Sequence, residues 1–264
     1  GLRTDFLTGL AVDQFRVRQD STYQTNITRH TPYAALGFRY PMTRTDAGGG
    51  VQLLEPILQF GWTDVNGPDA PNDESTTVEF DQGNLLALSH FPAPDQREDG
   101  VAIAWGLNWS RYGPGGWTIS GTAGQVVRRV ADPALSRTSG LSGTTSDLLL
   151  AGQVRLAARL AVTARGLIDQ NFGFTKAELR GDWSGDRARL TGSYLWLGID
   201  PQENRIDHQA PGRDLQFDIG LPSAIDPSPG SAINPSHIYQ LPLWALFPYN
   251  ICAATFGIAV LHVK

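Results

Sequence analysis

The sequence has a single cysteine, Cys252, so no disulfide bond can form within the chain. Only 18% of its 264 residues are charged, and the net charge of −5 gives no general attraction to nucleic acid. Segments with the apolar spacing of an amphipathic helix are scarce. The 29 glycines and 17 prolines argue against a bundle of helices, and the apolar share of 41% argues against disorder.

Motifs of enzymes and cofactor sites are also missing. The sequence contains no Gly-x-Ser-x-Gly, no P-loop and no Gly-x-Gly-x-x-Gly after a strand. The five histidines are far apart and lack the spacing of zinc ligands, and the acidic residues between 69 and 74 lack the spacing of a calcium loop. We therefore predict no catalytic residue, no cofactor and no metal site.

The sequence does contain long stretches in which apolar residues alternate with small or polar ones, as they do in β-strands. The clearest stretch runs from Val101 to Arg111. Its large apolar side chains share one face: Val101, Ile103, Trp105, Leu107 and Trp109. The opposite face, which includes Gly106, is predicted to face water.

Three hairpins follow from this alternation. The first crosses the glycine-rich turn at 113–116 and sets Arg111 opposite Trp117. The second joins 148–156 to 160–168 across the short segment 157–159. The third crosses Gly185-Asp186, and a two-residue turn there places Asp182 opposite Arg189.

The strands of the third hairpin carry charged side chains opposite their apolar face. These residues are Lys176, Glu178, Arg180, Asp182, Arg187 and Arg189. A soluble β-sandwich also alternates in this way. However, strands of about ten residues with tryptophans near their ends are typical of outer-membrane β-barrels, in which apolar residues face lipid and polar residues face the lumen. We therefore predict that the charged set faces the lumen and that the Val101–Trp109 face contacts lipid.

The connections support the same architecture. Short connections at 112–116, 157–159 and 185–186 alternate with longer ones at about 128–147, 169–173 and 198–213. Outer-membrane barrels have short turns on one side and longer loops on the other. We expect ten or eleven strands up to Ile219, which is an incomplete antiparallel transmembrane β-barrel. The segment from Thr63 to Asp81 is too polar to assign.

Several motifs in a fixed order resemble the barrel domain of the LptD family, most closely its alphaproteobacterial members. They are Leu54–Gln59, Asn72–Ser75, Glu79–Asp81, Phe91–Gly100 and Gly124–Arg128, and later Ser193–Leu197 and Asp200–Arg205. The resemblance covers about residues 5–219. It implies a bacterial outer-membrane protein that inserts lipopolysaccharide into the outer leaflet, together with the plug lipoprotein LptE and a periplasmic bridge of Lpt proteins. It also implies that the energy comes from a distant ATPase. The excess of cations in the charged set is compatible with passage of a phosphorylated glycolipid, but an ordinary solvated barrel interior is the preferred interpretation over a dedicated phosphate-contact site.

The two ends of the chain depart from that family. The sequence starts at Gly1 with no visible signal-peptide pattern, so it begins either after processing or within a larger protein, and we expect the second, with Gly1 inside the barrel. We assign residues 1–220 to a partial barrel domain and leave 221–264 as an atypical tail. Leu241–Val263 is long and uncharged enough for a membrane helix, but Pro248 would break it, so we expect a foreign or out-of-frame segment.

Two other classes of protein share part of the pattern. A general porin has the same alternation, aromatic residues and lumen, but it would not be expected to carry the Leu54–Gln59 and Phe91–Gly100 motifs in this order. A soluble all-β binding module would bury the tryptophan face in its core and purify without detergent.

Overall fold

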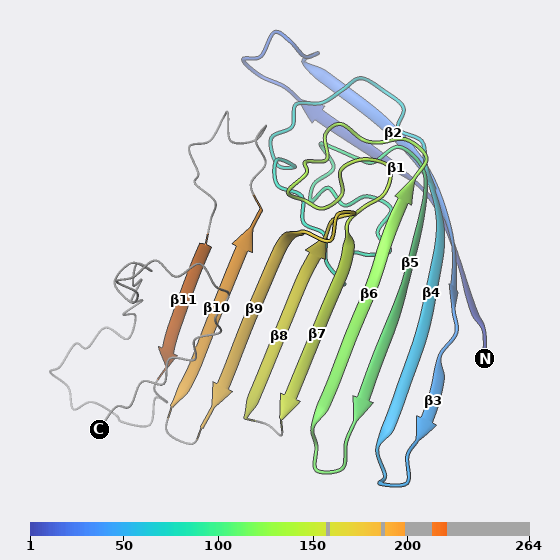
Figure 1. Cartoon of the computed structure of the whole chain (residues 1–264). Coiled ribbons are helices and arrows are strands. Elements are labelled where there is room, and N and C mark those ends of the chain that lie inside the picture. Colours follow the sequence, from blue (N-terminus) through green and yellow to red (C-terminus); the bar gives the residue numbers. More distant parts are fainter. Residues whose placement is uncertain (157–158, 186–187, 199–212, 221–264) are drawn as a thin grey trace, which may run out of the picture.

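Eleven strands form one antiparallel sheet in the computed structural model (Figure 1). The structure describes residues 1–156, 159–185, 188–198 and 213–220, and within these it has no helix, so the predicted all-β antiparallel fold is confirmed. The strands are β1 (Arg3–Arg16), β2 (Asn26–Arg39), β3 (Met42–Thr45), β4 (Val51–Thr63), β5 (Gly100–Tyr112), β6 (Thr118–Arg128), β7 (Leu148–Leu156), β8 (Leu160–Ile168), β9 (Phe174–Ser184), β10 (Arg189–Leu197) and β11 (Arg213–Gly220).

Strands that follow one another in the chain are neighbours in the sheet, and β3 continues the line of β2 along β4. The break between β2 and β3 falls at Tyr40 and Pro41, because proline has no N–H to donate to a neighbouring strand. The sheet runs from β1 to β11 and does not close in the described part of the chain. The predicted number of strands is confirmed, and apart from β3 and β11 they are 9 to 14 residues long. No helix of the described residues is long and apolar enough to span a membrane.

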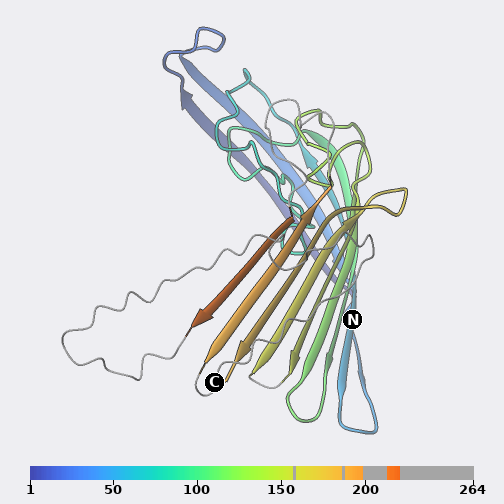
Figure 2. The same cartoon turned by 60° about the vertical axis from the view of Figure 1, so that its left-hand side comes forward.

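Long connections and tight turns lie at opposite ends of the sheet (Figure 1). The turns at 46–50 and 113–117 are at one end, and the connections 64–99, 129–147 and 169–173 are at the other. This confirms the predicted alternation wherever the connections are described. The connections 64–99 and 129–147 fold onto one side of the sheet (Figure 2). We call that side the inner face and the opposite side the outer face.

The buried core lies between the inner face and these two connections. The sheet contributes Ile57, Ala104, Val126, Leu149 and Leu167, and the connections contribute Val78, Phe80, Leu85, Phe91, Leu135 and Leu141. Both connections therefore supply apolar side chains. These side chains cover the half of the inner face nearest the long connections, which we call the upper half, and leave the half nearest the tight turns, the lower half, uncovered.

The sequence suggested that Gly106, on the inner side of β5, faces water. The structure shows that it does not. Gly106 is buried, and a Cβ atom there would lie 2.8 Å from Cδ2 of Leu85 and 2.9 Å from the carbonyl oxygen of Ala123. Gly124, its partner on β6, approaches the same leucine. The small residues on this face make room for Leu85 of the connection.

Two of the three hairpins have a different register from the prediction. Leu156 pairs with Leu160 as expected, but Arg111 pairs with Ile119, and Asp182 pairs with Thr191. Trp117 belongs to the turn, where its carbonyl accepts a hydrogen bond from Gly113 and its ring covers that glycine. Similarly, the Gly185 N–H donates to the Ala188 carbonyl, so Gly185 pairs across the hairpin and does not belong to a two-residue turn with Asp186. Both shifts are even, so no side chain changes face.

Candidate functional site

The outer face carries a continuous band of exposed apolar side chains. Val101, Trp105 and Leu107 are 40–41% exposed, while Ile103 and Trp109 are half-buried. The strand register extends the band across the sheet to Phe6, Leu10, Leu36, Phe60, Trp62, Val127, Leu150, Leu156, Leu179, Trp183 and Leu190, all of them exposed. A band of exposed apolar side chains that extends across this many strands marks a surface that contacts a membrane or another protein.

The inner segment, residues 64–99, is ordered by a buried carboxylate, Asp95. Its Oδ2 accepts backbone N–H groups of Asp73, Glu74 and Ser75, and the Ser75 hydroxyl bonds to Oδ1. Burial alone raises the pKa of Asp95, but these hydrogen bonds lower it below its ordinary value. The acidic residues near 69–74 thus belong to a turn held by Asp95. No group of three or more potential metal ligands occurs among the described residues.

A buried triad joins the inner segment to β6. Glu98 Oε1 lies 2.6 Å from His90 Nδ1, and Glu98 Oε2 accepts a hydrogen bond from Arg128 Nε at 2.5 Å. The side chains of His90, Arg128 and Glu98 are only 1%, 5% and 8% exposed. Burial raises the pKa of Glu98, but the hydrogen bonds from His90 and Arg128 outweigh burial and lower the pKa to about 2. Glu98 is therefore charged at neutral pH and neutralises the buried arginine.

The other side of the inner segment is attached to the edge of the sheet. The Arg97 guanidinium donates two hydrogen bonds to Asp13 of β1, at 2.7 and 2.9 Å. Arg29 of β2 bonds to the carbonyl of Pro94 and lies over the ring of Phe15. Bidentate arginine–carboxylate pairs are geometrically specific, so this contact fixes the segment against β1.

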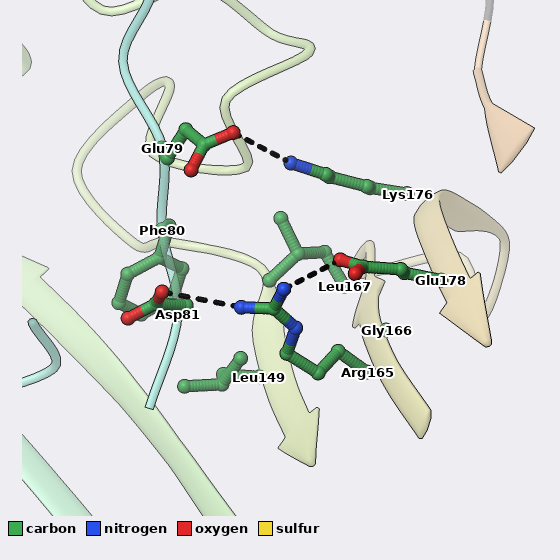
Figure 3. A pocket seen from close by; sticks show the side chains of 9 residues that line it. All are labelled: Glu79, Phe80, Asp81, Leu149, Arg165, Gly166, Leu167, Lys176 and Glu178. Carbon is green, nitrogen blue, oxygen red and sulfur yellow. Dashed lines mark hydrogen bonds and ion pairs between the residues drawn. The ribbon is translucent and has the colours of Figure 1, made fainter. Parts of the chain in front are cut away.

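Ion pairs also connect residues 79–81 of the inner segment to β8 and β9 (Figure 3). Arg165 lies between Asp81, at 3.3 Å, and Glu178, at 2.7 Å, and Lys176 Nζ is 3.5 Å from Glu79 Oε1. Phe80 packs beside them in the core formed with Leu149 and Leu167. The inner segment is thus held at three separate places on the sheet.

The charged residues singled out in the sequence follow β9 and β10 on the inner face. Lys176 and Glu178 are paired as above, and Arg180 forms an ion pair with Asp182 at 3.1 Å. Arg189 is exposed, and Arg187 lies outside the described residues. Glu79, Asp81 and Arg165 join this patch, and its described cations and carboxylates then balance. Arg187 is not included in this balance, so the excess of positive charge predicted from the sequence stays a prediction.

The lower half of the inner face is a polar surface, and its side chains hydrogen-bond to one another. Glu55 accepts a hydrogen bond from Asn108, which accepts one from Thr122, and Arg39 lies 3.6 Å from Glu55. Gln153 and Thr163 form a similar pair on β7 and β8. This surface suits water and sugar hydroxyl groups, whereas the outer face suits hydrocarbon.

Sequence reasoning missed the contacts of the inner segment. It named no structural partner for His90, Arg97 or Glu98, because Glu98 pairs with Arg128 and Arg97 pairs with Asp13, and both partners are distant in the chain. The available signal was the row of small residues at Ala104 and Gly106, which leaves space for a covering segment.

Comparison with known proteins gives one family. The model of the family described as LptD, LPS transport system D, matches residues 1–227. A search of curated proteins found no match to the chain.

Proposed function

Since the chain belongs to the LptD family, component D of a lipopolysaccharide transport system, we propose that its sheet is part of the barrel wall through which lipopolysaccharide reaches the outer leaflet. The observation that carries this proposal is the contrast between the two faces of one sheet. The outer face presents exposed apolar residues, and the lower inner face presents hydrogen-bonded polar ones. A wall with lipid on one side and a wet lumen on the other requires this contrast.

The proposal assigns the two sets of residues different neighbours. Val101, Ile103, Trp105, Leu107 and Trp109 contact membrane lipid. Lys176, Glu178, Arg180, Asp182 and Arg189 face the lumen, and Arg187 belongs to the same set by its sequence pattern. Members of the family act in transport and assembly, and we assign no catalytic residue and no cofactor to this chain.

Two protein partners complete the proposal. The plug lipoprotein LptE would contact the polar lower half of the inner face, because the inner segment covers the upper half. The periplasmic Lpt bridge would deliver lipopolysaccharide from the end of the sheet that carries the tight turns, since short turns face the periplasm in outer-membrane barrels.

Site-specific cross-linking tests the path of the substrate. A photo-reactive residue at Arg180 or Arg189, on the inner face, is expected to form lipopolysaccharide adducts during assembly in living cells. The same residue at Leu179 or Leu190, on the outer face, serves as the matched control and is expected to give none from lipopolysaccharide in transit. Inner-face positions without adducts, in cells whose lipopolysaccharide assembly is unchanged by Arg189→Ala, would contradict the proposed path.

A further inference from the structure

A hollow lies on the inner face beside the edge strand β1. It is a cleft of about 540 Å³ between the inner faces of β1, β2 and β4 and residues 88–98 of the inner segment. Binding sites for small molecules have volumes of about 300–1,000 Å³. The cleft is partly open to solvent, and its strand residues lie on the inner face, which a ligand in the lumen would pass.

One part of its wall is flat and apolar. The inner segment contributes Phe91, Pro92 and Pro94, and β2 contributes Tyr33. Tyr33 occupies the space above its strand partner Gly9, where a Cβ atom would lie 2.4 Å from the tyrosine hydroxyl oxygen. Any side chain at Gly9 would displace this ring, so the glycine allows Tyr33 to lie flat along the wall.

The rest of the wall carries polar groups without excess charge. Arg97 is neutralised by Asp13, and Glu98 is neutralised by Arg128. Gln96 adds an amide group, and Thr31 of β2, which is only 1% exposed, has a hydroxyl group with no hydrogen-bond partner. A buried polar atom without a partner is costly unless another molecule satisfies it.

These features select among ligand classes. A phosphate group would need a cation that is not already paired, and both charged pairs of the cleft are internally neutral. A hydrocarbon chain would leave the polar groups of the wall without partners. An uncharged sugar ring offers hydroxyl groups to the amide and the ion pair, and its C–H faces can pack on Tyr33 and the prolines.

We propose that this cleft binds an uncharged sugar unit of the lipopolysaccharide saccharide chain as it passes the edge of the sheet. The inference rests on the proposed function and adds a site to it. It assigns Tyr33 the role of a packing surface, and it assigns Thr31 and Gln96 the role of hydrogen-bonding groups.

The test uses a photo-reactive phenylalanine analogue at Tyr33 in the protein purified in detergent with lipopolysaccharide. We expect adducts at Tyr33 that an excess of dephosphorylated core oligosaccharide suppresses and that inorganic phosphate or lipid A does not. Thr31→Val should weaken the suppression about three- to tenfold, as expected for one lost hydrogen bond. Thr28→Val, an exposed position on the outer face of the same strand, should leave it unchanged.

Adducts at Arg180 but none at Tyr33 would overturn the sugar site and leave the proposed transport function intact. Competition by lipid A or by phosphate instead of oligosaccharide would also overturn it. Absence of adducts at both positions would contradict the proposed function as well. Thr31→Val is expected to preserve folding, since valine matches the shape of threonine and removes an unpartnered hydroxyl group.

Discussion

Replacing Glu98 with glutamine is expected to lower the free energy of unfolding by about 3–5 kcal/mol, because the change leaves Arg128 buried without a counter-charge. Arg128 is 5% exposed, and Glu98 supplies its carboxylate partner at 2.5 Å. Unfolding by guanidinium in detergent, followed by tryptophan fluorescence, measures the loss. The inner segment should also become sensitive to protease.

Glu55→Gln is the matched control. Glu55 pairs with Arg39 on the same inner face, but at 3.6 Å and with side chains 22% and 35% exposed. Its replacement is expected to cost about 1 kcal/mol or less. Adding Arg128→Met to Glu98→Gln should recover most of the lost stability, because no buried charge then remains unpaired. A Glu98→Gln variant as stable as Glu55→Gln would show that the triad does not hold the segment.

The pH dependence of the same contact follows from the lowered pKa of Glu98. The pKa is about 2 in the folded protein and near 4.5 in the unfolded chain, so the folded state binds the proton less readily. The stabilisation is fully present above about pH 4.5 and is lost as the pH falls towards 2. Glu98→Gln should remove this part of the acid dependence.

Leu107→Arg is expected to cost about 2–4 kcal/mol, the value for a charged residue near the middle of the bilayer, because the outer-face assignment places Leu107 against lipid. The yield of folded protein in the membrane measures this effect. Ser120→Arg is the control, because Ser120 is half-buried on the lower inner face and its strand partners Ser110 and Gln153 are polar.

Arginine at Gly106 is not a suitable control, since Leu85 and the Ala123 carbonyl fill the space beside it. We expect that change to be severely disruptive for steric reasons. Equal losses of folded protein for Leu107→Arg and Ser120→Arg would refute the assignment of the two faces.

From Val101 onward, alternation along the chain was sufficient to predict the strands and which of their side chains share a face. The period of two places Trp105 and Leu107 on one side regardless of register, so the outer face could be derived without knowing how the hairpins close. Register could not be derived in two hairpins, because it depends on how the turn folds. Trp117 lies in the turn and covers Gly113, a contact that no local pattern predicts.

The inner segment could not be predicted for a different reason. Residues 64–99 have no periodicity, and their position depends on pairs distant in the chain, such as Arg97 with Asp13 and Asp81 with Arg165. The inner segment covers only part of the sheet. For this reason the inner face of one strand combines small apolar residues with polar ones. The small residues lie under the segment, while polar residues such as Asn108 line the uncovered half.

The most direct test of the account is depletion of the protein in growing cells, with pulse-labelling of newly made lipopolysaccharide. We predict that labelled lipopolysaccharide at the cell surface falls severalfold while its total synthesis continues, and that wild-type protein restores it. A general porin would instead alter the uptake of small solutes. Unchanged delivery of labelled lipopolysaccharide to the surface, together with altered solute uptake, would contradict the account.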